Sequence, residues 1–245
     1  MNSILIIFQK ELSSFFSSLI AYIVMGVFIV AIGLIVWVFP DTNVLDYGYA
    51  DLGVFFNLSP YVLLFLVPAI TMRSIAEESK NGTLELLLTK PVSDISLVGG
   101  KFLANWLLVI LTLALTFIFV YSVYSLGNPQ GNIDLAAVTG SYIGLFLLSG
   151  VLVAMGLWAS SLNENQIVAF VLGVFLGFVF YVGFSSVSAL LGSSWMAIFF
   201  SSIALDEQYQ ALGKGLLDTR NVVFLISLAV FFLALTYLRV GQLRK

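Results

Sequence analysis

The sequence predicts an all-helical integral membrane protein with six transmembrane helices and an interfacial helix at its N-terminus. Of its 245 residues, 60% are hydrophobic and only 9% are charged, whereas a soluble domain carries about 25% charged residues. The mean hydropathy is +1.08, and a soluble fold of this composition would expose large apolar patches and aggregate. Apolar runs close to the roughly 20 residues that a helix needs to cross a bilayer recur along the chain.

The first predicted element is an amphipathic helix over residues 1–16. Ile4, Phe8, Leu12 and Phe15 recur at helical spacing, with polar and charged residues between them. Such a helix lies in the membrane interface before the first span; the alternative is a simple extension of that span. The N-terminus lacks a short apolar region with a small-residue cleavage site, so we expect no cleaved signal peptide.

Six apolar segments follow, and none of them contains Asp, Glu, Lys or Arg. The second carries Pro60 and Pro68, which can kink part of it. The sixth is short and needs flanking residues to span the membrane. In chain order the segments are Leu19–Phe39, Leu52–Met72, Phe102–Tyr124, Val138–Ser161, Ile167–Leu191 and Val222–Leu238.

The distribution of Lys and Arg predicts the orientation. With the N-terminus inside, eight of these residues fall on the cytoplasmic side and two on the outside. The sequence therefore predicts that both termini are cytoplasmic. The inner eight are Lys10, Arg73, Lys80, Lys90, Lys101, Arg239, Arg244 and Lys245, and the outer two are Lys214 and Arg220.

The segment 192–220, between the fifth and sixth spans, is expected on the outer side. Within it, Trp195–Leu205 is apolar but only 11 residues long, which is too short to cross. We expect it to be a re-entrant or interfacial helix. If it crossed, the C-terminal Lys and Arg residues would lie outside, against the charge rule.

Small residues and one polar pair are the other notable features of the spans. The pairs Gly140/Gly144 and Gly173/Gly177 permit close helix approach, either within one subunit or at a dimer interface. The pair Asn105-Trp106, near the cytoplasmic start of the third span, is predicted to anchor that helix at the interface, and the alternative is a substrate contact.

The residues present exclude several classes of function. The chain has no Cys and no His, which removes disulfides, thiol chemistry, the usual zinc sites and imidazole catalysis. No predicted span holds an ionisable residue other than tyrosine, whereas ion-coupled transporters usually place one there. Neither Gly100-Lys101 nor Gly213-Lys214 completes a Walker A motif. We therefore expect a chain that is not an enzyme, binds no cofactor or metal, and receives energy from another subunit.

The loop from Arg73 to Lys101 is the predicted functional segment. It holds 4 of the 10 Lys and Arg residues and 4 of the 13 acids, between two apolar spans. Its leucines either face a partner or dip into the membrane interface. We expect Ser74–Lys80 to continue the second span and Asn81-Gly82 to interrupt it. Thr83–Thr89 should then form a short helix, which Lys90-Pro91 ends. Ser93-Asp94 should cap the helix that follows.

This loop resembles the signature of the ABC-2 class of ABC-transporter permeases. The resemblance rests on Glu77/Glu78, the run Asn81–Ser93 (NGTLELLLTKPVS) and Gly100-Lys101. It implies a coupling helix that docks on an ATP-binding subunit, a second permease half as partner, and a location in the bacterial plasma (inner) membrane. The residues that the resemblance assigns to ATPase coupling are Glu77, Glu78, Gly82, Thr83, Glu85, Pro91 and Lys101.

A narrower resemblance is to the permease subunit (the "F" subunit) of the gliding-motility (Gld) system of Bacteroidetes. It implies a further membrane subunit as partner, although this chain lacks a histidine expected in one matching segment. The alternatives are an anchoring subunit without cargo, and an uncoupled channel or membrane enzyme. The segments that carry the resemblance are Ala69–Ser74, the GTLELLLTKPVS run, Leu126–Asp134, Ser161–Gln166, Asp206–Tyr209 and Gly215–Asn221.

Overall fold

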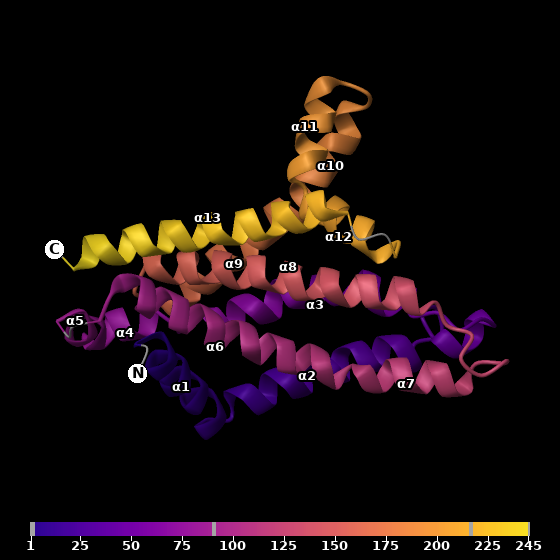
Figure 1. Cartoon of the computed structure of the whole chain (residues 1–245), viewed down its shortest axis with the longest axis horizontal. Coiled ribbons are helices and arrows are strands. Elements are labelled where there is room, and N and C mark those ends of the chain that lie inside the picture. Colours follow the sequence, from indigo (N-terminus) through magenta and orange to yellow (C-terminus); the bar gives the residue numbers. More distant parts are fainter. Residues whose placement is uncertain (1–2, 90–91, 216–217, 245) are drawn as a thin grey trace.

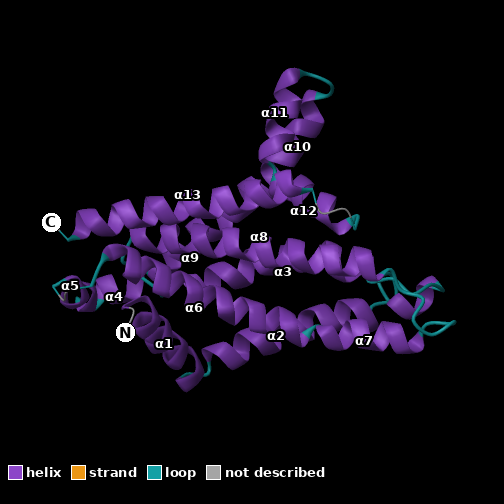
Figure 2. Ribbon diagram, in the orientation of Figure 1, coloured by secondary structure: helices purple, strands orange, loops and turns teal. Residues whose placement is uncertain are grey.

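The computed structural model describes residues 3–89, 92–215 and 218–244. Their regular structure is entirely helical (Figure 2). Six stretches within them are long and apolar enough to cross a membrane, which confirms the predicted fold class and number of spans. They are Ile20–Trp37 (α2), Gly53–Lys80 (α3 and α4), Asp94–Leu126 (α6 and α7), Leu135–Leu162 (α8), Gln166–Leu191 (α9, η2 and α10) and Thr219–Leu243 (α13).

The single elements follow from local sequence signals. Side chains cap α6, α8, α9 and α13 by accepting a backbone N–H at the helix start, from Ser93, Asp134, Asn165 and Asp218 respectively. The remaining bounds are α1 Ser3–Ser17, η1 Val44–Tyr47, α3 Gly53–Thr71, α4 Ala76–Lys80, α5 Thr83–Leu88, α6 Asp94–Leu115, α7 Phe117–Leu126, α9 Gln166–Phe178, η2 Val179–Gly183, α10 Phe184–Leu191, α11 Trp195–Ile203 and α12 Leu205–Gly213.

Helix α8 is the centre of the bundle, where it packs against α3, α6, α9, α12 and α13. Small residues on its surface let these neighbours approach. A Cβ at Gly140 would overlap the carbonyl of Leu212, and one at Gly156 would overlap Thr71. On α9, a Cβ at Gly173 would press on Pro68 of α3. The glycine pairs therefore serve packing within one subunit.

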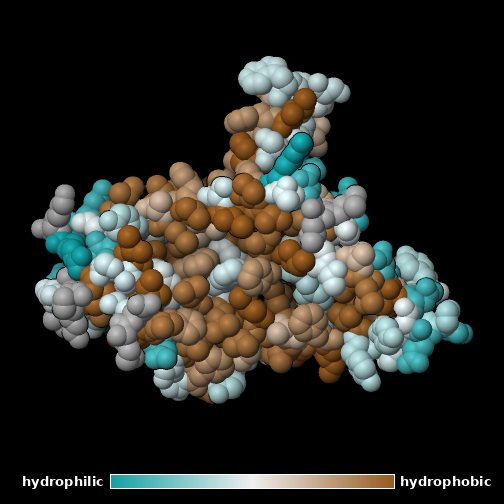
Figure 3. Space-filling view, viewed as in Figure 1, coloured by the Kyte–Doolittle hydropathy of each residue, from teal (hydrophilic) through white to brown (hydrophobic). Residues whose placement is uncertain are grey.

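Both chain termini lie at one end of the bundle, together with α1, α4 and α5 (Figure 1). We call this the terminus end. On the face shown in Figure 3, hydrophobic side chains cover the middle of the bundle, and hydrophilic ones gather towards its two ends. This distribution fits a bundle whose middle lies in lipid.

Helix α3 remains one helix despite its two internal prolines. Pro60 has no N–H, so the carbonyl of Phe56 has no helix partner. The hydroxyl of Tyr209 in α12 donates to that carbonyl at 2.7 Å. Here a side chain distant in sequence satisfies the carbonyl that the proline leaves free.

The fifth span departs from the prediction in its second half. After α9 the chain forms the π-helical turn η2, and α10 then leaves the bundle. Figure 1 shows α10 and α11 as a hairpin that projects from the side of the bundle. With nine residues, α11 is too short to cross a membrane, as expected. Whether the hairpin is re-entrant or interfacial stays a prediction.

A separate helix, α1, forms where the amphipathic helix was expected. Ile7, Glu11 and Phe15 are buried, while Ile4 and Phe8 of the predicted apolar face are partly buried. A charged residue thus occupies the middle of the buried stripe. The reason is an opposing charge on α6.

Candidate functional site

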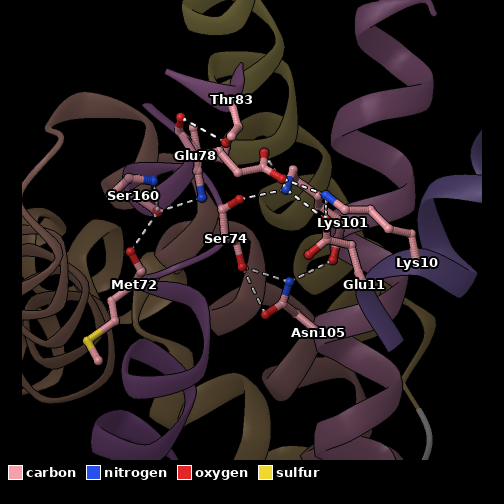
Figure 4. A network of polar contacts seen from close by, with 11 residues as sticks. Lys10, Glu11, Met72, Ser74, Glu78, Thr83, Lys101, Asn105 and Ser160 are labelled. Carbon is pink, nitrogen blue, oxygen red and sulfur yellow. Dashed lines mark hydrogen bonds and ion pairs between the residues drawn. The ribbon is translucent and has the colours of Figure 1, made fainter. Parts of the chain in front are cut away.

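The candidate functional site lies at the terminus end, where α1, α4 and α5 meet the start of α6. Figure 4 shows its polar contacts, and its centre is the buried side chain of Lys101 on α6. Parts of the chain far apart in sequence meet here, because α1 packs along α6 and α4 packs against α5 and α8.

A turn after α3 places the short helices of the site. As predicted, the second span continues to Lys80, but a turn interrupts it, since α3 ends at Thr71 and α4 begins at Ala76. The hydroxyl of Ser160 on α8 accepts the backbone N–H groups of Ile75 and Ala76, each at 3.1 Å, and donates to the carbonyl of Met72 at 3.0 Å. One buried side chain therefore satisfies the backbone groups that the break exposes.

The bend between α4 and α5 requires glycine. Gly82 has φ of 66°, a left-handed conformation that costs other residues energy. The hydroxyl of Thr83 donates to the carbonyl of Glu78 at 3.2 Å and closes the bend. Helix α5 then spans Thr83–Leu88, which agrees with the short helix predicted over Thr83–Thr89.

A small apolar cluster attaches α5 to the bundle. Its members come from α1, the turn before α4, α5, α6 and α13. Leu84 is the member from α5 and is 3% exposed, while Leu87 packs against the cluster. The side chains of Leu86 and Leu88 lie outside those the structure describes. The buried members are Ile7, Ile75, Leu84, Leu97, Val98 and Val240.

Two bases and two acids form a network beneath this cluster. Lys101 is 1% exposed, and its Nζ lies 3.0 Å from Glu11 Oε1 and 2.8 Å from Glu78 Oε2. Lys10 Nζ lies 3.1 Å from Glu11 Oε1 and 2.7 Å from Glu78 Oε1. The formal charges sum to zero, and Lys101, Glu11 and Glu78 form the inner part of the network, while the side chain of Lys10 is 53% exposed at its edge. Breaking such a network on one side is costly.

Uncharged groups complete the surroundings of Lys101. Its ammonium donates to the carbonyl of Ser74 at 2.7 Å. The amide of Asn105 donates to the hydroxyl of Ser74 at 3.0 Å and to the carbonyl of Lys101 at 2.7 Å. Asn105 is fully buried, so its prediction as part of an interfacial anchor is wrong: it holds the turn after α3 against α6.

The charges of the network alter the pKa of two of its members. Burial acts to raise the pKa of Glu11, but the ammonium groups of Lys101 and Lys10 outweigh it and hold the pKa below its usual value. Burial likewise acts to lower the pKa of Lys10, but Glu78 and Glu11 outweigh it and raise that pKa. Both groups are therefore charged near neutral pH.

The structure separates the predicted coupling residues into two groups. Gly82, Thr83 and Glu85 are exposed around the start of α5, where another protein can reach them. Glu78 and Lys101 are instead joined to each other inside the site. Glu77 is partly exposed on α4, and Pro91 lies outside the described residues.

Sequence reasoning missed the partners that make the site a unit. They are contributed by α1, the turn after α3, α6 and α8. The sequence held one signal for Lys10 and Glu11, because a Lys-Glu pair on an amphipathic helix needs polar partners if that helix packs on the bundle. The missed residues are Lys10, Glu11, Ser74, Asn105 and Ser160.

Among the described residues, no group of three or more His, Cys, Asp or Glu side chains could hold a metal ion. The ion pairs of the site join α1, α4 and α6 to one another, and Arg73, Glu77, Lys80 and Glu85 lie outside these pairs.

Comparison with known proteins identifies the class. The search of curated proteins gave no match to this chain. A family model described as "ABC-2 family transporter protein" matches residues 61–242, well over half of the chain. The matched region begins within α3 and ends within α13, so it includes α4, α5 and all or part of five of the six candidate spans. Proteins of this family are membrane subunits of ABC transporters and not the ATPases. The chain therefore belongs to the ABC-2 family and is a multi-pass membrane permease component of an ABC transporter.

Proposed function

We propose that this chain couples ATP hydrolysis by a partner ATP-binding subunit to the movement of a substrate, and that the partner docks on the exposed face of α5. The single observation that carries the proposal is that Leu84 attaches α5 to a body made of α1, α4 and the start of α6, and that an ion network of zero net formal charge joins these three elements. A docking surface formed by Gly82, Thr83 and Glu85 lies on the outside of that body.

In this mechanism a force that the partner applies to α5 is transmitted to the transmembrane helices. Leu84 ties α5 to the apolar cluster, and Glu78 of α4 is held by Lys101 of α6. Two transmembrane helices, α3 and α6, meet this body through Ser74 and Asn105. The ATP-bound partner dimer binds one arrangement of the body better than the other, and thereby shifts the population between inward-facing and outward-facing states.

The proposal includes the placement of the chain in the cell. The excess of Lys and Arg supports a cytoplasmic terminus end in the inner membrane, and both termini share that end in Figure 1. The chain provides one half of the path, and a second permease half, identical or not, provides the other. The resemblance of several loops to the gliding-motility permease subunit supports a role in a motility-associated complex with a further membrane subunit.

The experiment that tests the coupling proposal compares ATPase rates of reconstituted complexes. Glu85→Arg reverses the one charge on α5, and Gly82→Val removes the left-handed bend. Both variants should insert and fold, and both should abolish stimulation of the partner's ATPase activity. Glu207→Arg, which makes the same change on the exposed surface of α12, is the control. Wild-type ATPase rates in the Glu85→Arg and Gly82→Val complexes would refute the docking site.

A further inference from the structure

A cavity of about 580 Å³ lies at the terminus end between α1, α4 and α5. Its wall combines apolar and polar groups. Phe15 and Ile20 line it at the end of α1 and the start of α2, and Arg73, Glu77 and Asn81 line it around α4. The buried ion network closes one side of the cavity through Glu11 and Glu78.

The cavity lies at the depth of lipid headgroups. Ile20 is the first residue of one span, and Arg73 follows the last residue of α3 by two positions. Since spanning helices begin and end at the boundary of the hydrocarbon core, the cavity opens at that boundary. This placement holds whichever side of the membrane the terminus end occupies.

Two opposite charges in the cavity have no partner. Lys10, Glu11, Glu78 and Lys101 neutralise one another. Arg73 and Glu77 remain, and neither side chain makes a hydrogen bond or ion pair within the described part of the chain. They are four positions apart, which would favour pairing on one helix. The backbone N–H of Glu77 donates to the carbonyl of Arg73 at 3.3 Å, but no ion pair joins the two side chains among those the structure describes.

We infer that this cavity binds the headgroup of a zwitterionic phospholipid of the phosphatidylethanolamine type. The guanidinium of Arg73 suits the lipid phosphate, which it can bind with two N–H groups. The carboxylate of Glu77 suits the ammonium group, whose N–H donors it accepts. Phe15 and Ile20 provide an apolar wall for the start of the acyl chains.

The arrangement of charges sets the selectivity. Phosphatidylglycerol brings a negative charge and no ammonium, so Glu77 repels it. Phosphatidylcholine has a quaternary ammonium without N–H donors, so it loses the hydrogen bond to Glu77. A soluble phosphoethanolamine group carries the right charges but gains nothing from the apolar wall, and it should bind far more weakly than the lipid. The inference concerns this chain alone and does not depend on the proposed coupling to an ATPase.

The experiment measures retention of lipids by the purified full-length chain, without any ATPase, using native mass spectrometry. The probes are phosphatidylethanolamine, phosphatidylcholine and phosphatidylglycerol with identical acyl chains, and soluble phosphoethanolamine. We expect wild type to prefer phosphatidylethanolamine by roughly tenfold, the effect of one charge-assisted hydrogen bond. Arg73→Gln should lose retention, Arg73→Lys should keep part of it, and Glu77→Gln should lose the preference over phosphatidylglycerol.

The controls are Arg220→Gln and Glu207→Gln, which make the same changes at exposed positions away from the cavity. Each variant must keep the wild-type melting temperature in lipid-free detergent. Equal retention of the three lipids by wild type would overturn the inference, as would equal behaviour of Arg73→Gln and Arg220→Gln. So would binding of soluble phosphoethanolamine but not of the lipid. If the Arg73 and Glu77 variants retained lipid normally but lost capture of the ATPase, the cavity would be a protein-docking site instead.

Discussion

Replacing Lys101 by Met tests whether the buried network holds the terminus end together. The wild-type ammonium is 1% exposed and makes three contacts, to Glu11, Glu78 and the carbonyl of Ser74, at 3.0, 2.8 and 2.7 Å. Without it, two carboxylates share the single charge of Lys10. Removing one partner of a buried ion pair costs about 3–5 kcal/mol of stability, and we expect Lys101→Met to fall in that range.

The companion variant separates a shared network from independent contacts. Glu11→Gln alone leaves Lys101 paired with Glu78 and should cost about 1.5–3 kcal/mol, the value of a hydrogen bond to a charged group. In Lys101→Met/Glu11→Gln, Lys10 and Glu78 remain as a neutral pair. The double variant should therefore lose less than the sum of the two single variants, by at least about 1 kcal/mol.

The assay is reversible unfolding in mixed micelles, with the free energy of unfolding measured for wild type and the three variants. Lys80→Met removes an exposed lysine at the same end and should change stability by less than about 0.5 kcal/mol. The reasoning would be refuted if Lys101→Met matched Lys80→Met, or if the two single costs simply added.

Three further predictions concern acid, the turn after α3 and the packing of α8. The pKa of Glu11 is lowered in the fold, so the stability that its charged form contributes is fully present above the pKa of the unfolded chain and is lost as pH falls through the folded pKa. Between about pH 6 and about pH 3.5, the melting temperature should therefore fall more for wild type than for Glu11→Gln. Equal slopes of melting temperature against pH would contradict this. Ser160→Ala leaves two buried amides without an acceptor and should cost about 2–4 kcal/mol in the same unfolding assay, whereas an effect no larger than that of the exposed Ser202→Ala would show that other groups replace the hydroxyl. Gly140→Val places methyl groups against a carbonyl of α12 and should cost about 1–3 kcal/mol or more, while Gly26→Ala, which meets nothing within 4 Å, should be neutral or slightly stabilising by thermal melting.

The sequence predicted the spans because hydrophobic length is a one-dimensional property. Each crossing needs about 20 apolar residues whatever its neighbours are, so all six could be identified without knowledge of packing. The bend before α5 was also predictable, because Asn81-Gly82 is a local signal and Gly82 takes a left-handed conformation. The N-cap at Ser93 belongs to the same kind of local evidence.

The parts that could not be predicted depend on contacts across the chain. The break after Thr71 is stabilised by Ser160, 85 positions from the amide of Ile75, and no local pattern indicates that pairing. The burial of Glu11 on α1 could not be predicted for the same reason. Hydrophobic spacing indicates an apolar face through Ile4 and Phe8, but it does not reveal that the opposing charge of Lys101 brings Glu11 inward. The composition of the third span, which is free of charges, was enough to recognise it. The composition could not reveal that Lys101, just before that span, pairs with Glu11 of α1.

The position of the Lys101 ammonium between α1, α4 and α6 indicates what the ion network does. A permease that is moved from outside the membrane must transmit force without letting its docking surface separate from its spans. Apolar contact alone is non-directional and permits sliding, whereas a buried ammonium with three fixed oxygen neighbours fixes the register of α1, α4 and α6. Replacing the whole cluster by apolar side chains can keep stability and still lose that register. A variant with Lys10, Glu11, Glu78 and Lys101 all changed to apolar residues of similar size should therefore fold, yet show reduced stimulation of the partner's ATPase. Full stimulation in such a variant would show that the network contributes stability alone.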